Sequence, residues 1–380
     1  MTIETVFRNA RVVLPDEVIE GSVRLENGTI ASVDAGSSSA GEDFEGDFLI
    51  PGLIELHTDQ LENHYRPRPG VFWNPHAALQ AHDVQIAGSG ITTVFDAVRI
   101  GSDPETPGGM GEHVQVLVDA IAQGVGDGRL KADHLIHLRC ELPTPDVLVD
   151  FERFAHLPLV RLASVMDHTP GQRQYQTVSK YVAYYKERMR LSDAEMEAFI
   201  AERHAEQAMY SARNREAILR RGLAAGIAFA SHDDATDEQV AESVKDGVSI
   251  AEFPTTMIAA EHSHDAGLAV LMGAPNVVRG GSHSGNIAAL DLAREGCLDI
   301  LSSDYVPGAL LLAAFMLPEA TDSITLPQAI RMVSTTPARA AHLDDRGEIA
   351  AGKRADLVRV RLHGDMPVVK GVWRQGRRVS

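Results

Sequence analysis

Only 5% of the 380 residues are aromatic, and cysteine occurs just twice, at Cys140 and Cys297. Two cysteines are too few for a disulfide framework or for a zinc site built on cysteine. Positive charge is also scarce, because 35 Lys and Arg face 53 Asp and Glu and leave a net charge of -18. Nucleic acids and anionic membranes are bound through basic surfaces. We therefore expect neither as a partner of this chain.

Long apolar runs are missing as well. The N-terminal segment carries Glu4, Arg8, Asn9 and Arg11 among its apolar residues, unlike the uninterrupted apolar core of a signal peptide. No other stretch approaches the roughly 20 consecutive apolar residues that a membrane helix needs. The sequence therefore predicts a cytoplasmic protein.

Both ends of the chain have the pattern of short β-strands. Near the N-terminus, Asn27 and Gly28 separate two strand-like segments and predict a hairpin, since both residue types tolerate positive φ. Near the C-terminus, residues 356–362 and 367–379 also read as strands. Neither end is large enough to form a stable sheet alone. We therefore predict one small β domain formed by residues 1–50 and 345–380.

The central part of the chain alternates strand-like apolar runs with helical patterns, which is typical of βα units. The predicted fold class is α/β: a TIM-like (β/α)8 barrel over residues 51–344 beside the small β domain. An excursion over residues 172–223, with a capping-box sequence at Ser192, could be a lid, a subunit contact or both. The eight candidate strands are residues 48–57, 91–98, 134–141, 159–168, 226–232, 248–253, 268–274 and 298–304.

Side chains that can bind metal follow five of these strands, at the carboxyl end where barrel enzymes carry their active sites. His57 and Asp59 are two residues apart, so in an extended strand both point to the same side and can reach one ion. A single histidine at a strand end more often has a structural role, but five such strand ends together favour a metal site. The candidate ligands are His57, Asp59, Glu141, His168, His232 and Asp304.

Imidazoles combined with carboxylates suit one or two divalent metal ions, with Zn²⁺ or Mn²⁺ preferred. Such ions lower the pKa of a bound water and stabilise a developing oxyanion. Asp304 is the candidate base for that water, although alone it could be a helix N-cap. Asp233 and Asp234 are expected to cap or orient rather than to bind metal. The pattern predicts a metal-dependent hydrolase.

The segment 51–59, Pro-Gly-Leu-Ile-Glu-Leu-His-Thr-Asp, resembles the first-strand motif of the amidohydrolase superfamily, with Asp59 in place of its second histidine. The later segment 352–357, Gly-Lys-Arg-Ala-Asp-Leu, also looks like that superfamily, where it leads back into the small β domain. The resemblance implies that the six candidates bind metal, with Glu141 as bridging ligand in place of the usual carboxylated lysine. A glutamate in that role is similar to the sugar-phosphate deacetylase branch.

Longer motifs resemble one family within this superfamily, the alpha-D-ribose 1-methylphosphonate 5-triphosphate diphosphatases of the bacterial carbon–phosphorus lyase pathway. This resemblance implies hydrolysis of a ribose triphosphate to the 5-phosphate and pyrophosphate, as part of phosphonate metabolism. It extends over residues 9–379, and its motifs lie at residues 57–69, 137–143, 166–174, 230–236, 251–256, 271–286 and 301–305.

A triphosphate carries several negative charges, which arginine forks and the backbone N–H groups of Gly-rich loops can bind. Arg173 is the strongest candidate for this task, because its loop leaves the barrel mouth directly. His283 is expected either to donate a proton or hydrogen bond to the substrate, as a second catalytic residue beside Asp304, or to be a loop residue. The other candidates for substrate binding are Arg66, Arg68, Arg139, Arg279 and Ser282.

Two other functions stay open. An amidohydrolase-type deacetylase or deaminase acting on a C–N bond would share the barrel and the metals, but would have an apolar pocket in place of an arginine-rich mouth. A scaffold protein without activity would be expected to have lost metal ligands, whereas each expected position here holds one. The superfamily resemblance also implies a homo-oligomer such as a dimer.

Overall fold

The computed structural model describes residues 4–102, 110–173, 181–182, 186, 189, 191–282 and 285–380. Contacts within the chain divide it into two compact units. The first unit comprises Met1–Asp96, Gln123–Leu135 and Leu271–Ser380, and the second comprises Ala97–Ala122 and Ile136–Val270. None of the described helices is long and apolar enough to cross a membrane.

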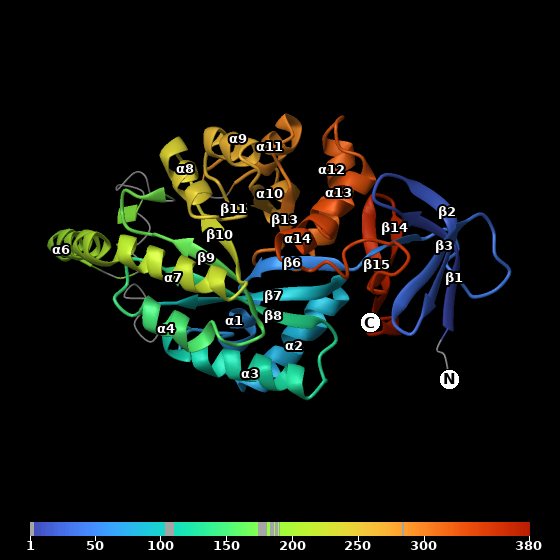
Figure 1. The fold of residues 1–380 in the computed structure, drawn as a ribbon, viewed down its shortest axis with the longest axis horizontal. Helices are drawn as coiled ribbons and strands as arrows, with labels where there is room; N and C mark the ends of the chain where they lie inside the picture. Colours follow the sequence, from blue (N-terminus) through green and yellow to red (C-terminus); the bar gives the residue numbers. More distant parts are fainter. Residues whose placement is uncertain are drawn as a thin grey trace. The chain divides into compact units, whose positions relative to one another are not determined.

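Strands from both ends of the chain form one mixed sheet in the first unit, in the order β16-β15-β14-β5-β1-β2-β3, with β4 beside β1 (Figure 1). The predicted hairpin is present, since Asn27 and Gly28 have φ of 51° and 86° and connect β2 to β3. The sheet confirms the small β domain expected from the two ends. Its strands are β1 (Glu4–Val13), β2 (Val18–Glu26), β3 (Thr29–Ala35), β4 (Glu42–Asp43), β5 (Phe48–Pro51), β14 (Leu357–His363), β15 (Met366–Arg374) and β16 (Arg377–Arg378).

This mixed sheet has an apolar core with aromatic residues at its centre, although aromatic residues are rare in the chain. The ring of Phe7 lies 4.8 Å from that of Phe44 and 4.7 Å from that of Trp373, measured between centroids. All three side chains are buried. Because Phe7 lies on β1, Phe44 directly follows β4 and Trp373 lies on β15, aromatic packing stabilises the pairing of the two chain ends.

Eight parallel strands form the second sheet, in the order β13-β12-β11-β10-β9-β8-β7-β6. Its first and last strands lie side by side, because the Ser303 backbone N–H donates to the Glu55 carboxylate and Thr58 Oγ1 donates to the carbonyl of Asp304. The sheet is a near-closed barrel, which confirms the predicted fold class. Its strands are β6 (Leu53–Thr58), β7 (Ile91–Ile100), β8 (Asp133–Glu141), β9 (Val160–Met166), β10 (Ala228–His232), β11 (Ile250–Glu252), β12 (Ala269–Gly273) and β13 (Ile300–Ser302).

The first expected barrel strand, residues 48–57, was wrong in one respect: it is two strands that belong to different sheets. β5 joins the mixed sheet and β6 joins the barrel, with Gly52 between them. A Cβ atom at Gly52 would lie 2.2 Å from Thr92 Oγ1, so only glycine fits this crossing. The other seven predicted strands agree with β7 to β13 to within a few residues.

The segment 352–357 ties the C-terminal strands to the start of β8. Nη2 of Arg354 lies 2.6 Å from the carboxylates of both Asp133 and Asp356. Asp133 also pairs with Arg346 at 2.8 Å and with Arg374 at 3.0 Å. The motif that resembles the superfamily therefore has a structural role in the first unit.

Helices alternate with the barrel strands. The segment after β7 begins as the 3-10 turn η1 (Met110–His113) and continues as α3. Beyond α6 and α7, the described helices are α1 (Gln60–Tyr65), α2 (Pro75–Gly88), α3 (Val114–Gly126), α4 (Val147–Phe154), α8 (Asp237–Lys245), α9 (Met257–Asp265), α10 (Ala274–Arg279), α11 (Ala289–Glu295), α12 (Ala309–Ala320), α13 (Leu326–Met332) and α14 (Thr335–Ala340).

The described part of the 172–223 excursion is mainly helical. α6 (Asp193–Glu206) begins at the capping box predicted at Ser192 and passes through the π-helix η3 (Gln207–Ser211) into α7 (Ala212–Ala224). π-Helical turns are frequent at functional sites. Here Gln207 Nε2 and Ser211 Oγ each donate to Asp167 Oδ2 over 3.1 Å. The irregular turn is thus fixed to the residue that precedes His168.

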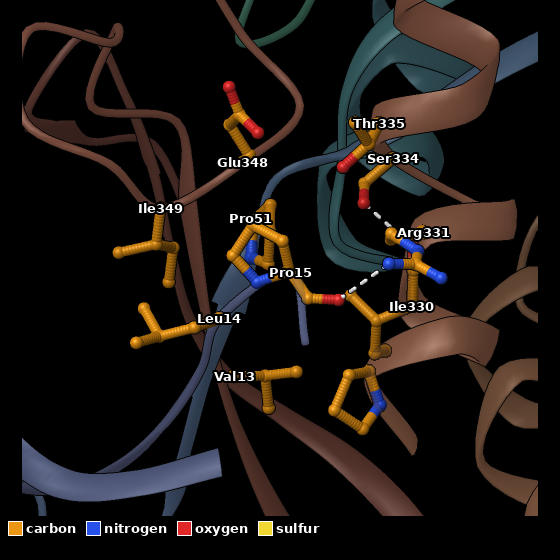
Figure 2. A pocket seen from close by; sticks show the side chains of 11 residues that line it. Val13, Leu14, Pro15, Pro51, Ile330, Arg331, Ser334, Thr335, Glu348 and Ile349 are labelled. Atoms are coloured by element: carbon orange, nitrogen blue, oxygen red, sulfur yellow. Dashed lines mark hydrogen bonds between the residues drawn. The ribbon is translucent and has the colours of Figure 1, made fainter. Parts of the chain in front are cut away.

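A small cavity of about 10 Å³ lies in the first unit where the end of β1 meets α13 and α14 (Figure 2). Its wall includes Pro15, Pro51 and Arg331, and Arg331 Nη1 donates to the carbonyl of Pro15 over 3.0 Å. Because Pro51 precedes the first residue of β6, the cavity lies at the amino-terminal end of that strand. Barrel enzymes carry their active sites at the opposite, carboxyl end, so this cavity is not a candidate active site.

Candidate metal centre

In the first unit, three predicted ligands lie at or just beyond the carboxyl ends of β6 and β13. His57 is 2% exposed in β6, and Asp59 is the N-cap residue of α1 but makes no capping hydrogen bond through its side chain. Among the described residues, Asp59 Oδ1 is buried without a hydrogen-bond partner. Asp304 has φ of 53°, and its carbonyl accepts from Thr58 Oγ1 over 2.6 Å. The backbone therefore holds the end of β13 against the end of β6.

Glu55 connects the same two strand ends from inside the fold, although no role was predicted for it. Its side chain is 0% exposed and accepts from the His57 backbone N–H over 2.6 Å. It also accepts from Ser302 Oγ over 2.7 Å and from the Ser303 N–H over 2.5 Å. Burial raises the pKa of Glu55 to about 7, although the hydrogen bonds from these serines and from His57 oppose the rise. Glu55 thus fixes the backbone next to His57 and Asp304.

In the second unit, Glu141 and His168 form a close pair. His168 Nδ1 lies 2.6 Å from Glu141 Oε2, and the His168 backbone N–H donates to Oε1 over 2.9 Å. Arg99 contributes a third contact to Glu141, at 3.2 Å. Burial alone would raise the pKa of Glu141, but the charges of His168 and Arg99 outweigh it and hold that pKa well below its usual range. Glu141 is therefore an ionised carboxylate.

His232 at the end of β10 repeats this arrangement with a different carboxylate. His232 Nδ1 lies 2.7 Å from Glu252 Oε2, and Glu252 is 1% exposed at the end of β11. A carboxylate that holds one ring nitrogen leaves the other oriented for a metal ion. The rings of His168 and His232 lie 5.7 Å apart, measured between centroids. Glu252 belongs to a motif of the family resemblance, but sequence reasoning had assigned it no role.

Asp233 completes a group of possible ligands with these two histidines. Its Oδ2 lies 3.3 Å from His232 Nε2 and 3.9 Å from His168 Nε2. One ligand atom from each of the three residues falls within 4.8 Å of the others. Asp233 had been expected to cap or orient, as had Asp234. Asp234 does orient, since it pairs with Arg173 and accepts from Ser243 Oγ over 3.1 Å.

Arg173, the favoured candidate for phosphate binding, is surrounded by acceptors of the second unit. Its guanidinium pairs with Asp234 and lies 3.3 Å from Glu242, and it is 6% exposed. Nη1 also donates to the carbonyl of His232 over 3.4 Å. Burial lowers the pKa of Arg173 to about 10, and Arg215 adds to the effect, while acidic neighbours that include Glu242 oppose it. The structure therefore places Arg173 as an internal partner of the segment after β10.

The remaining predicted substrate residues have varied surroundings. Arg139 is half-buried on β8, and its Nε has no hydrogen-bond partner among the described residues. The guanidinium of Arg66 lies 5.7 Å from the ring centroid of Phe72, and Arg68 is exposed. Arg279 is exposed at the end of α10, and Ser282 is half-buried. His283 lies outside the described residues.

A second group of metal-capable side chains lies in the first unit, on α2 and strands β7 and β8. His82 Nε2 and His134 Nδ1 each lie 2.7 Å from the Asp96 carboxylate, and His134 Nε2 lies 3.3 Å from Asp83. Burial disfavours the His134 cation, but Asp96 and Asp83 outweigh it and raise the pKa of His134 to about 9. Burial acts likewise on Asp96, yet the two histidines lower its pKa to about 2. The carboxylates and imidazoles of this group pair with one another, which fits a structural role.

The residues of the two units fit divalent metal binding in their chemistry. Asp59 Oδ1 and Asp233 Oδ2 are buried carboxylate oxygens for which the described residues provide no hydrogen-bond donor. Such atoms are costly unless a cation compensates them. His168 and His232 each have one ring nitrogen held by a glutamate, as metal-binding histidines do. Both observations fit the binding of a divalent cation by residues of this kind.

Comparison with known proteins identifies the class. The model of the Amidohydrolase family matches residues 48–379, so the chain belongs to the amidohydrolase family. Solved structures agree at the level of the fold: N-acetylglucosamine-6-phosphate deacetylase from Pasteurella multocida has 15% identity and a TM-score of 0.61, with 99% of each chain covered. Dihydropyrimidinase from Brevibacillus agri NCHU1002 has 14% identity and a TM-score of 0.62, over 99% of this chain and 95% of that one.

Within the family, one relative matches over its whole length. Alpha-D-ribose 1-methylphosphonate 5-triphosphate diphosphatase of Escherichia coli (strain K12) is 48% identical over 377 residues, which cover 98% of this chain and 100% of that protein. Adenine deaminase of Desulfatibacillum aliphaticivorans is 27% identical over 370 residues, which cover 93% of this chain but only 54% of the deaminase. The similarity to the diphosphatase confirms the family resemblance found in the sequence motifs.

Proposed function

We propose that this protein hydrolyses alpha-D-ribose 1-methylphosphonate 5-triphosphate to the 5-phosphate and pyrophosphate. The observation that carries the proposal is the 48% identity, over the full length of both chains, to the E. coli protein named for this reaction. The matched region omits almost none of the chain, so it includes the strand ends that bear the candidate ligands. The protein would then act in the breakdown of phosphonates.

The ions of this site are one or two divalent metals, with Zn²⁺ or Mn²⁺ preferred. A bound ion supplies an activated water and stabilises charge on the phosphoryl oxygens. The proposal is supported by the placement of the ligands after strands of a single parallel barrel, at the end where such barrels carry their active sites. The ligands are His57, Asp59, Glu141, His168, His232 and Asp304.

Asp304 is the proposed acceptor of the proton that the attacking water loses. Its position is fixed from both sides, since Asp304 N donates to Ser302 Oγ over 3.2 Å and its carbonyl accepts from Thr58 Oγ1. A base must be held within hydrogen-bond reach of the proton that it abstracts. The two hydrogen bonds of the Asp304 backbone hold the residue in a fixed position. His283 remains the proposed donor of a proton or hydrogen bond to the substrate.

Arg139 is the arginine that the structure supports best for substrate binding. Alternate residues of a strand share a face, so Arg139 and Glu141 lie on the same side of β8. The Nε of Arg139, which has no hydrogen-bond partner among the described residues, offers a charge-assisted hydrogen bond to a phosphate oxygen. Arg173 contributes by holding the segment after β10 in place. The other proposed contacts are Arg66, Arg279 and Ser282.

The first experiment is an assay of pyrophosphate release by purified, metal-reconstituted protein, with the phosphonate triphosphate and ATP as substrates. We expect release from the phosphonate, little from ATP, and a loss of at least about 100-fold in kcat for Asp304→Asn, as for removal of a general base. The matched control is Asp322→Asn, because Asp322 is exposed. Metal binding without any pyrophosphate release would contradict the proposal and favour a deacetylase or deaminase acting on a C–N bond.

We also propose that the active form is a homo-oligomer in the cytoplasm, with a small molecule as its only partner. The net charge of -18 supports the absence of nucleic acid and of anionic membranes. Light scattering of the purified protein checks the oligomeric state, and a mass of 41.1 kDa in solution would contradict it.

A further inference from the structure

We propose that Asp233 is a metal ligand, and that it completes with His168 and His232 a three-residue site within the second unit. The inference rests on the proposed function, which supplies the metal, and it adds a ligand that neither the sequence pattern nor the family resemblance assigned. Asp233 lies immediately after His232, at the carboxyl end of β10. Its role follows from its hydrogen bonding, its backbone and the placement of the two histidines.

One carboxylate oxygen of Asp233 makes no hydrogen bond to the part of the chain that the structure describes. Asp233 is 5% exposed, and its Oδ2 is buried without a hydrogen-bond partner among the described residues. The nearby guanidinium of Arg173 is directed to Asp234 and Glu242. A buried charged oxygen without a partner costs several kcal/mol, so a native structure seldom leaves one uncompensated. A cation next to Oδ2 removes that cost.

Each histidine next to Oδ2 is held by a glutamate at its other ring nitrogen. Glu141 Oε2 lies 2.6 Å from His168 Nδ1, and Glu252 Oε2 lies 2.7 Å from His232 Nδ1. Both Nε2 atoms lie within 3.9 Å of Asp233 Oδ2. Two imidazoles oriented in this way, together with a carboxylate oxygen, form a ligand set that suits a divalent cation.

The backbone at Asp233 is unusual in a way that serves this geometry. Its φ of 56° lies in the left-handed region, which a residue other than glycine seldom occupies. The Asp233 N–H donates to the Glu252 carbonyl over 2.9 Å, so the strained conformation is held by the neighbouring strand. Residues held in such conformations cluster at functional sites. In this conformation Oδ2 lies 3.3 Å from His232 Nε2 and 3.9 Å from His168 Nε2.

The rival explanation is that Asp233 pairs with a protonated histidine and binds no metal. In that case its removal would weaken the metal-free fold and leave metal affinity unchanged. As a ligand, it would contribute to metal affinity and little to the stability of the metal-free protein. The two roles therefore differ in a measurement that does not involve activity.

The test measures Zn²⁺ and Mn²⁺ affinity of chelator-treated protein by competition with a chromogenic chelator, and metal content by mass spectrometry. The variants are Asp233→Asn and Asp233→Gly, because both residue types tolerate positive φ and preserve the backbone. We expect Asp233→Gly to lower the affinity of one metal equivalent by at least about 10-fold to 100-fold. Asp233→Asn, which keeps one oxygen, should lie between Asp233→Gly and the wild type.

The matched control is Asp167→Asn. Asp167 is also a buried aspartate next to a predicted histidine ligand, but its oxygens already accept from the Thr169 N–H, Gln207 and Ser211. We expect this variant to bind metal within about twofold of the wild type. The oxygens of Asp167 already accept hydrogen bonds from protein donors, so they are not needed as metal ligands.

The outcomes separate this inference from the proposed function. Wild-type affinity in Asp233→Gly, together with loss of metal in His232→Asn, would overturn the role of Asp233 and leave the metal centre intact. A wild-type protein that binds neither Zn²⁺ nor Mn²⁺ would overturn both. Reduced stability of the metal-free Asp233→Gly protein with unchanged metal affinity would establish the ion-pair role in place of the ligand role.

Discussion

Replacing Asp96 with asparagine should destabilise the metal-free protein by about 3 to 5 kcal/mol, the usual cost of removing one partner from a buried ion pair. Asp96 is 1% exposed and accepts from both His82 and His134 over 2.7 Å. Asparagine has nearly the same size, so packing is kept. The loss comes from the charge, because the His134 cation would then face an amide in place of a carboxylate.

The size of the effect should depend on pH in a defined direction. Burial opposes the charge of His134, but Asp96 and Asp83 raise its pKa from 6.5 to about 9. A pKa raised in the folded state stabilises the protein fully below the unfolded value, and this stabilisation is lost as the pH rises through the folded value. The contribution of His134 is therefore complete below pH 6.5 and declines up to about pH 9. A displacement of that size corresponds to about 3 kcal/mol.

At low pH, the contribution of Asp96 to stability follows from the same reasoning, but it is lost as the pH falls. Although burial disfavours its charge, His134 and His82 lower the pKa of Asp96 from 3.8 to about 2. A lowered pKa stabilises the fold above the unfolded value, and this stabilisation is lost as the pH falls through the folded value. The cluster should therefore contribute most between about pH 4 and 6.5.

Equilibrium urea unfolding, followed by circular dichroism in the presence of chelator, measures both expectations at pH 6 and pH 9.5. The control is Asp291→Asn, which weakens an exposed pair with Arg294 and should cost less than about 0.5 kcal/mol at either pH. The reasoning fails if Asp96→Asn unfolds within about 1 kcal/mol of the wild type at pH 6. It also fails if the deficit of the variant is the same at both pH values.

Two substitutions test other close contacts. Glu55→Gln should destabilise the protein by about 1 to 3 kcal/mol, because an amide N–H would face the N–H of His57 or Ser303; urea unfolding that matches the wild type would contradict this. Gly222→Ala should destabilise the protein by about 1 to 3 kcal/mol, since a Cβ would lie 2.4 Å from Phe229 Cζ. The control is Gly126→Ala, which has open space around it and should be neutral or stabilising by up to about 1 kcal/mol in the same assay.

Much of the fold could be predicted because its signals are local. The alternation of apolar runs and helical patterns gave the barrel strands, and Asn27 with Gly28 gave a hairpin that the structure contains. The exception at residues 48–57 has a physical cause. An extended segment keeps the same local pattern when it passes from one sheet to another, and only the close approach of Thr92 to Gly52 marks the crossing. That contact joins residues far apart in the sequence.

In the candidate site, too, features that depend on neighbouring residues in the sequence could be predicted, and contacts between distant residues could not. Metal-capable residues could be selected because they follow predicted strands, whereas their partners could not. Glu55, Glu252 and Asp233 are ordinary carboxylates in the sequence, and their roles depend on which backbone or imidazole lies next to them. The φ of 56° at Asp233 is likewise invisible, because Ser-His-Asp-Asp has no strong turn signal of its own.

The arginines show how such distant contacts change a functional assignment. Arg173 was favoured because its loop leaves the barrel mouth, but Asp234 and Glu242, which neutralise it, lie on the segment after β10 and in α8. An arginine that already pairs with two carboxylates would have to break those pairs to bind phosphate, and would leave a buried charge behind. Arg139 meets no such cost at Nε, because no residue that the structure describes pairs with that atom. We therefore expect phosphate affinity to depend on Arg139 through direct contact, and on Arg173 through the position of His232, whose carbonyl it holds.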